Sequence, residues 1–149
     1  MTKYPLGKSD LMVSKIGFGC MSLSPDQVDI DRLLHRAIDI GIQYFDTADI
    51  YNFGENEKWV GKALQQKRKD VVLASKVGNK WRADKSGWDW TPTAAHIRTS
   101  IDESLQRLQT DYLDLYQLHG GTMEDNFEEI VACFEELKQQ GKIRYYGIS

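Results

Sequence analysis

The chain has 149 residues, of which 41% are hydrophobic and 28% are charged, a composition typical of one globular domain and not of a disordered, collagen-like or coiled-coil chain. Its formal net charge of −3 gives no electrostatic reason to expect nucleic acid or an anionic membrane as a partner. Cys20 and Cys133 are too few for a disulfide framework and lack metal-ligand spacing, so we expect no metal and a reducing, cytoplasmic location. No apolar run reaches the roughly 18–20 residues of a membrane span, and we expect no signal peptide.

The first third of the chain predicts a small hairpin, a strand, a helix and a second strand. The hairpin is expected over Tyr4–Ser14, where a Leu-Gly-Lys-Ser-Asp-Leu run is a turn signal. A short apolar strand is expected over Lys15–Gly19. An apolar stripe with helical period then runs through residues 30–38 and ends at Gly41, a residue suited to stop a helix. The second strand is expected over Gln43–Ala48.

The rest of the chain continues this alternation of strands and helices. Further strands are expected at Val71–Lys76, Tyr112–Leu118 and Arg144–Ile148. Further helices are expected from near Gly54, after the Thr-Pro-Thr run at 91–93, and from Phe127 to a stop at Gly141. Strict alternation of strand and helix favours a parallel sheet with right-handed crossovers.

One long loop is expected over Gly78–Thr91, and it carries Trp81, Trp88 and Trp90. Loops of this length in compact domains are often functional, and aromatic side chains on them can wall a pocket. The alternative is that the three indoles only cap one end of the fold. The sequence leaves both interpretations open.

Two architectures fit the alternation, namely an open doubly wound sheet and an eight-stranded barrel. A nucleotide-binding open sheet should carry a glycine fingerprint directly after its first strand, at the start of a helix. Gly17 and Gly19 are in place, but Ser22 stands where the third glycine belongs, and a Ser-Pro-Asp run comes before any helix. The fingerprint is incomplete, so it does not support the open sheet.

Ionisable side chains stand at the ends of three successive predicted strands. These are Asp46, Lys76 and His119, and Tyr51 follows the first of the three strands closely. Each alone has an ordinary explanation: a turn cap, a solvent-facing lysine, a loop histidine or a packed tyrosine. Because the carboxyl ends of parallel barrel strands converge on the face that holds the active site, their coincidence indicates one shared site.

The chemistry of this set is specific. An ammonium beside a phenol stabilises the phenolate, and a carboxylate keeps that ammonium charged and oriented. A neutral imidazole can donate a hydrogen bond to a carbonyl oxygen and orient it. A site that combines these four side chains can protonate a carbonyl oxygen while a hydride reaches the carbonyl carbon. The sequence shows no serine or cysteine elbow for acyl transfer, no paired carboxylates for glycosides and no histidine cluster for a metal.

These residues resemble the signature of the aldo-keto reductases. The resemblance covers essentially the whole chain and is carried by Phe45–Tyr51 with Gly54 and Glu57, by Lys76, by Asp111–His119, and by Gly141–Arg144 leading into Gly147–Ser149. It is nearest to the bacterial branch related to general stress reductases and potassium-channel β-subunits. It implies a (β/α)8 TIM barrel, an α/β fold, that reduces aldehydes or ketones with NADPH and without a Rossmann domain.

The resemblance also implies a role for each matching residue. Tyr51 would be the general acid, Lys76 would favour its ionisation, Asp46 would support Lys76, and His119 would orient the carbonyl. The positions expected to contact the cofactor are Gly19, Cys20, Met21, Asp46 and Ser149. The positions expected to contact the substrate are Trp81, Trp88, Trp90 and His119. Asn52 stands where many relatives have glycine, a departure that leaves the four catalytic positions intact.

A barrel of this kind needs about 250 residues or more. The sequence predicts a hairpin, five parallel strands and four helices, so we expect residues 1–149 to be the N-terminal half of one barrel domain. Its edge strands at Lys15–Gly19 and Arg144–Ile148 would lack partners, and this half alone is expected to be inactive and prone to self-association. The partner expected for the whole protein is a small carbonyl compound. A competing interpretation is a cofactor-binding regulatory module similar to the channel β-subunits.

Overall fold

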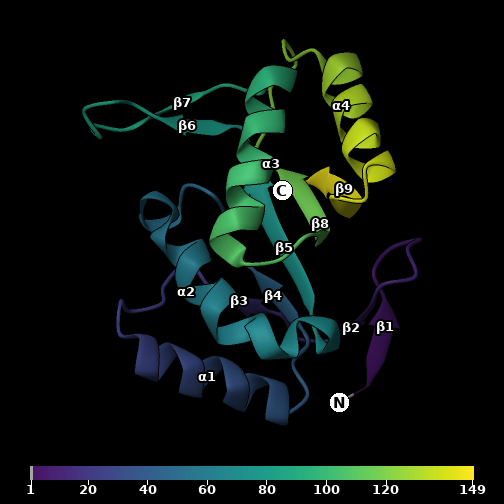
Figure 1. The fold of residues 1–149 in the computed structure, drawn as a ribbon. Helices are drawn as coiled ribbons and strands as arrows, with labels where there is room; N and C mark the ends of the chain where they lie inside the picture. Colours follow the sequence, from purple (N-terminus) through teal and green to yellow (C-terminus); the bar gives the residue numbers. More distant parts are fainter. Residues whose placement is uncertain (1) are drawn as a thin grey trace.

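A central sheet of five parallel strands organises the molecule, for which the computed structural model describes residues 2–149 (Figure 1). The strands, in their spatial order, are β3 (Phe18–Gly19), β4 (Tyr44–Asp46), β5 (Val72–Val77), β8 (Leu113–Leu118) and β9 (Ile143–Ile148). The helices between them are α1 (Gln27–Asp39), α2 (Glu55–Leu64), α3 (Ala94–Leu108) and α4 (Phe127–Gln139). Each strand pairs in parallel with the one that follows it in this sheet, as in the first five strands of a (β/α)8 barrel. The predicted fold class is confirmed.

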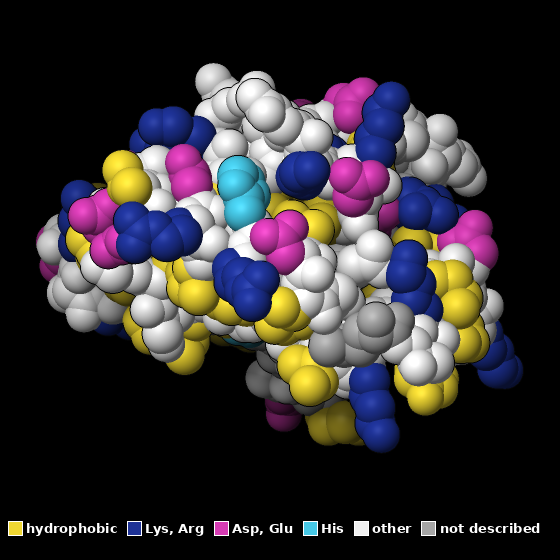
Figure 2. Space-filling view, turned by 90° about the horizontal axis from the view of Figure 1, so that it is seen from below, with side chains coloured by type: hydrophobic (Ala, Val, Ile, Leu, Met, Phe, Trp, Pro, Cys, Tyr) yellow, Lys and Arg dark blue, Asp and Glu magenta, His cyan; other side chains and the backbone are white. Residues whose placement is uncertain are grey.

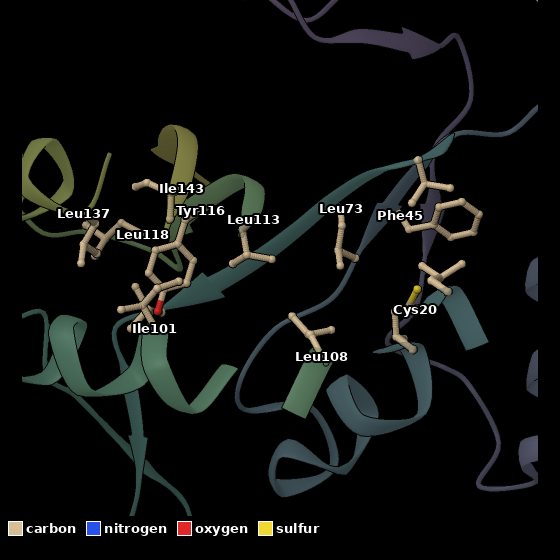
Figure 3. Close-up of a cluster of buried hydrophobic side chains, with 14 of the residues drawn as sticks. Cys20, Phe45, Leu73, Ile101, Leu108, Leu113, Tyr116, Leu118, Leu137 and Ile143 are labelled. Atoms are coloured by element: carbon tan, nitrogen blue, oxygen red, sulfur yellow. The ribbon is translucent and has the colours of Figure 1, made fainter. Parts of the chain in front are cut away.

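The four predicted helices are present, and each packs an apolar stripe against the sheet. The core between them includes Phe45, Leu73, Ile101 and Tyr116, whose side chains lie between strands and helices in Figure 3. The stop expected at Gly41 is also present, because this residue has a φ of 95° directly after the end of α1. Periodicity and helix-stop signals therefore located the helices correctly.

Four of the five strands lie within two residues of their predicted bounds, but the first is shorter than expected. Only Phe18 and Gly19 pair with β4, although the apolar run predicted Lys15–Gly19. Before Phe18, the Ser14 hydroxyl replaces the backbone hydrogen bonds that would join this segment to the neighbouring strand. It donates to the carbonyl of Ile16 at 2.6 Å and accepts from the backbone N–H of Gln43 at 3.0 Å. The segment is held by a side chain and not by strand pairing.

The predicted loop over Gly78–Thr91 is wrong, because most of this segment is a β-hairpin. Strands β6 (Asn79–Trp81) and β7 (Trp88–Trp90) pair antiparallel, with Trp81 opposite Trp88. Aromatic residues favour strands, and facing aromatic pairs stabilise them. A second hairpin, formed by β1 (Lys3–Pro5) and β2 (Met12–Ser14), confirms the one expected at Tyr4–Ser14.

The outer surface seen from the side of α1 carries basic and acidic side chains intermixed (Figure 2). Asp29 and Arg32 on α1 form one exposed ion pair of this surface. Within residues 2–149, no helix combines the length and the apolar character needed to cross a membrane.

A buried ion network holds the amino ends of the strands together. The Asp114 carboxylate, 2% exposed, lies 2.8 Å from the Arg68 guanidinium and 2.9 Å from that of Arg144, and it accepts the backbone N–H of Leu73 at 3.0 Å. Arg144 also reaches Asp10 at 2.8 Å, which ties the N-terminal hairpin to β9. This network lies at the end of the sheet opposite to His119, where it stabilises the fold.

We predict that Asp114→Asn lowers the free energy of unfolding by about 3 kcal/mol, because it removes the charge that compensates two guanidinium groups. Urea unfolding of the full-length protein measures this loss. Asp102→Asn is the matched control, since Asp102 pairs with Lys142 at an exposed position. There the change should stay below about 1 kcal/mol. Equal losses in the two variants would contradict the importance assigned to burial.

Candidate active site

The ends of three neighbouring strands bring the predicted catalytic residues together. Asp46 ends β4, Lys76 lies one residue before the end of β5, and His119 directly follows β8. The Lys76 Nζ atom is 2.6 Å from Asp46 Oδ2 and 3.5 Å from Tyr51 Oη. The Tyr51 and His119 rings meet edge to face, with their centroids 5.9 Å apart. All four side chains therefore share one site at the carboxyl end of the sheet.

Lys76 is the most buried of the four, at 4% exposure. A buried ammonium is costly unless it is paired and hydrogen-bonded. Lys76 meets this requirement twice, since it donates to Asp46 Oδ2 at 2.6 Å and to the backbone carbonyl of Thr47 at 2.8 Å. Both acceptors come from the end of β4, so the ammonium is fixed on the side of the site that faces Tyr51.

A left-handed turn places Tyr51 at the site. The short 3-10 helix η1 (Tyr51–Gly54) contains Asn52 and Phe53 with φ values of 50° and 56°, followed by Gly54 at 85°. Left-handed geometry costs roughly 1–2 kcal/mol for an ordinary residue, and asparagine and glycine tolerate it best. The Phe53 ring is held by the Trp81 ring, with 4.2 Å between centroids. The turn directly follows Tyr51, whose phenol oxygen lies 3.5 Å from Lys76 Nζ, and it leads the chain into the first turn of α2.

His119 is tuned toward its neutral form. Burial lowers the pKa of its imidazole, and the nearby Lys76 ammonium lowers this pKa further, against an opposing effect of Asp46. The buried Nδ1 atom has no hydrogen-bond partner among residues 2–149. A neutral imidazole can donate a hydrogen bond to a carbonyl oxygen without bringing a second positive charge beside Lys76.

A cleft of about 350 Å³ adjoins Asp46 and Lys76. It is lined by Gly17, Phe18, Gly19, Tyr44, Asp46, Lys76, Gln117 and Ser149. A Cβ atom on Gly17 would lie 2.7 Å from the Tyr44 ring, so glycine lets this ring lie against the backbone. The buried Asp46 Oδ1 has no partner in the described part of the chain. The cleft thus combines a flat wall with free polar groups, which fits an aromatic carboxamide such as nicotinamide.

The residues predicted to contact a cofactor divide into two groups. Gly19, Asp46 and Ser149 line the cleft. The thiol of Cys20 is fully buried in the core, and this burial raises its pKa to about 12. Met21 is 61% exposed. The expected contacts of Cys20 and Met21 remain predictions.

Sequence reasoning missed Gln117, which lines the same cleft. Lys76 on β5 and Gln117 on β8 are direct partners in the sheet register. Side chains that are paired in register project from the same face of a sheet. Gln117 lies two residues before His119 on a predicted strand, and this position could have indicated that its side chain faces the same site.

The three indoles of the hairpin have different surroundings. Trp81 donates to the carbonyl of Ile50 at 3.1 Å, next to Tyr51. Trp88 is half exposed and packs its ring edge-to-face against Trp81. Trp90 donates to the Asp125 carboxylate at 2.9 Å and covers the backbone at Gly78. Trp81 therefore adjoins the turn that carries the phenol, Trp88 packs on Trp81, and Trp90 anchors the base of the hairpin.

A larger cavity of about 580 Å³ lies between the hairpin and α3 and contains none of the four converging residues. Its lining includes Asp49, His96, Ser100, Glu103 and Arg107. Burial and the neighbouring Glu57 raise the pKa of Asp49 to about 8. The smaller cleft contacts Asp46 and Lys76, whereas Tyr51 and His119 line neither of the two cavities.

Comparison with known proteins gives consistent matches. The model of the Aldo/keto reductase family matches residues 15–149. An uncharacterized oxidoreductase of Bacillus subtilis, YqkF, is 54% identical over the whole chain and 49% of its own length. The aldo-keto reductase yakc [NADP(+)] of Schizosaccharomyces pombe is 34% identical over 92% of the chain and 42% of its own length.

Among solved structures, the holo form of the aldo-keto reductase AKR11C1 from Bacillus halodurans superposes with a TM-score of 0.96 at 56% identity. The match covers all of this chain and 50% of that one. The chain spans about half the length of the curated relatives it matches.

We predict that Lys76→Met makes the His119 imidazole titrate at higher pH. The substitution removes a positive charge that disfavours the imidazolium and leaves Asp46, which favours it. Histidine NMR titration of the full-length protein measures this change. Lys80→Met is the matched control, since Lys80 acts on His96 and not on His119. An unchanged His119 titration in Lys76→Met would refute the proposed electrostatic contact.

Proposed function

The chain belongs to the aldo/keto reductase family of oxidoreductases, and from this premise we propose that the protein reduces aldehydes or ketones to alcohols with NADPH. One observation carries the proposal. A buried ammonium, Lys76, lies 3.5 Å from the phenol oxygen of Tyr51 and 2.6 Å from the carboxylate of Asp46. This arrangement is suited to a phenol that donates its proton to a substrate oxygen, because the neighbouring ammonium stabilises the phenolate that forms.

The cofactor part of the proposal rests on the cleft beside the four residues. NADPH, when bound, supplies the hydride. Gly19, Asp46, Gln117 and Ser149 would hold the nicotinamide end, because they combine an open backbone position with polar side chains. The choice of NADPH is supported by the name of the fission-yeast relative, which specifies NADP(+).

The chain's own residues divide the work of carbonyl reduction. His119 binds the carbonyl oxygen through its neutral imidazole and directs it toward Tyr51. Tyr51 donates its proton to that oxygen as negative charge develops there, and becomes a phenolate. The Lys76 ammonium stabilises the phenolate, and Asp46 keeps the ammonium in place. General acid catalysis by the phenol contributes typically 10²–10⁴-fold to the rate.

The proposal extends to the organisation of the whole protein. We propose that residues 1–149 form the first half of one barrel domain. The order of the parallel strands supports this, since each strand of the five-stranded sheet follows its neighbour in sequence. The coverage of the relatives by about half supports it as well.

We further propose that Trp81 and Trp88 contact the carbonyl substrate. Trp81 stacks on Phe53 in the turn that follows Tyr51, and Trp88 packs on Trp81 and leaves half of its surface exposed. A substrate contact by Trp90 remains a prediction, although its bond to Asp125 gives it a supporting role as well.

In the full-length protein, Tyr51→Phe should lower kcat/KM for carbonyl reduction by at least about 10²-fold, because it removes the proton donor. The affinity for NADPH should stay nearly unchanged, since the phenol acts mainly on the transition-state oxygen. Stopped-flow reduction of an aldehyde panel and a fluorescence titration with NADPH measure the two quantities.

Tyr112→Phe is the matched control, because this ring stacks on Arg68 near the opposite end of the sheet. It should leave kcat/KM unchanged. A Tyr51→Phe variant that keeps most of its kcat/KM would remove Tyr51 from the role of acid. A wild-type protein that binds NADPH and reduces no carbonyl compound would favour the regulatory alternative.

Trp88→Ala should change the ratio of kcat/KM values between small and bulky aldehydes while the KM for NADPH changes less. The reason is that the indole is half exposed, packs on Trp81 and does not line the cofactor cleft. Trp90→Ala provides the contrast and should lower the thermal midpoint, because it removes a partly buried side chain that packs on the core and donates to Asp125. A Trp88→Ala variant with a cofactor defect and unchanged aldehyde preference would contradict this placement.

A further inference from the structure

Asn56 is a fully buried polar residue in the first turn of α2, and its side chain contacts the ends of two neighbouring strands. Its Nδ2 atom donates to the carbonyl of Cys20, just after β3, at 2.8 Å. Its Oδ1 atom accepts from the hydroxyl of Thr47, just after β4, at 2.7 Å. One side-chain amide therefore connects the segment beside the cofactor cleft to the segment that carries Asp46.

The direction of each hydrogen bond follows from the chemistry of the partners. A backbone carbonyl can only accept, so the amide nitrogen must face Cys20. The amide oxygen then faces Thr47, whose hydroxyl must donate. Thr47 is itself fully buried, which leaves this hydroxyl no contact with bulk water. The amide has one orientation that satisfies both neighbours, and neither partner is easily replaced.

Both partners of Asn56 are linked directly to the catalytic groups. The carbonyl of Thr47 accepts from the Lys76 ammonium at 2.8 Å. The backbone N–H of Cys20 donates to the carbonyl of Asp46 at 2.8 Å. A displacement of either strand end would change the position of the ammonium or of its carboxylate partner.

The backbone before Asn56 makes such a link necessary. Three consecutive left-handed residues, Asn52 to Gly54, separate Tyr51 from α2. This geometry is costly and persists only where the surrounding structure fixes both of its ends. Asn56 and the next residue, Glu57, are both fully buried, and Glu57 accepts from the hydroxyl of Ser75, beside Lys76. The end of the turn is therefore attached to the strands that carry the site.

We propose that Asn56 is a positioning residue of the active site, which sets the place of the Lys76 ammonium relative to Tyr51 and to the cofactor-facing segment after β3 by bridging Thr47 and Cys20. The proposal rests on the proposed function for its catalytic consequence, but its structural content is independent of catalysis. The proposal gives the first turn of α2 a role in the chemistry, although the side chains of this turn do not reach the substrate.

The first test uses His119 as a reporter and requires no turnover. The Lys76 ammonium lowers the pKa of the His119 imidazole, so a displaced ammonium should make the imidazole titrate closer to its ordinary range. We expect Asn56→Ala and Thr47→Val, both made in the full-length protein, to raise the pH of the His119 titration. Histidine NMR measures it, and His119→Asn assigns the resonance.

The second test separates positioning from general stability. Thr47→Val keeps the shape of the side chain and removes the donor to Asn56, whereas Thr47→Ser keeps the donor. Ser104→Ala removes another fully buried hydroxyl, which contacts Arg107 and none of the site residues. We expect kcat for carbonyl reduction to fall about 10²-fold in Asn56→Ala and about 10-fold in Thr47→Val, because small misplacements cost this much. Thr47→Ser and Ser104→Ala should stay within a factor of about 3 of wild type.

The outcomes discriminate clearly. A changed His119 titration and a lowered kcat in Thr47→Val, with both restored in Thr47→Ser, support the proposal. An unchanged His119 titration in Asn56→Ala and Thr47→Val, or an equal loss of kcat in Ser104→Ala, overturns it. If Asn56→Ala does not fold, the Thr47 pair decides. If the wild type reduces no carbonyl compound, the proposed function fails, and the His119 titration still decides the role of Asn56.

Discussion

The buried ammonium of Lys76 is the constraint on which the rest of the site depends. A charge with 4% exposure requires partners, and the structure supplies them from one strand end, as the Asp46 carboxylate and the Thr47 carbonyl. That requirement fixes the end of β4 against β5. The left-handed turn that follows Tyr51 then leads the chain from the phenol into α2.

Stability and chemistry are separated along the strands. Asp114, with two guanidinium partners, holds the amino ends, and the paired charges of Asp46 and Lys76 lie at the carboxyl ends. Both are buried ion pairs, but their carboxylates differ in whether an oxygen atom lacks a hydrogen-bond partner. Asp46 Oδ1 has no partner among residues 2–149, whereas both oxygens of Asp114 are bonded. Of these two carboxylates, the one that keeps an unpartnered oxygen atom therefore lies at the carboxyl end of the strands, beside the cleft, the end at which parallel barrels place their active sites.

The sequence was sufficient for the elements and for the four converging residues because their signals are local. Apolar periodicity located α1 to α4, and the strand-end positions of Asp46, Lys76 and His119 follow from the parallel sheet. The hairpin at Asn79–Trp90 and the turn at Asn52 were missed for different reasons. The turn depends on a partner distant in sequence, through the stacking of Phe53 on Trp81, and no window of neighbouring residues contains this contact. The hairpin pairs residues at most 11 apart, such as Trp81 with Trp88, a local signal that its interpretation as a loop overlooked. The role of Asn56 was hidden for the same reason as the turn, since its two partners lie 9 and 36 residues away.

The catalytic groups and the walls of the cleft differ in how the fold holds them. Asp46, Lys76 and His119 come from β4, β5 and β8, which are interior strands of the sheet with a neighbour on each side. The cleft, in contrast, takes Phe18 and Gly19 from β3 and Ser149 from the end of β9, the two outermost strands. Side chains on paired interior strands are held rigidly, whereas an edge strand has hydrogen bonds on one side only. The placement of Asp46, Lys76 and His119 therefore depends mainly on contacts between interior strands, and the shape of the cleft depends on whatever fixes β3 and β9. The hydrogen bond from Asn56 to the carbonyl of Cys20 is one contact that ties the segment after β3, at the edge of the sheet, to the interior strand ends.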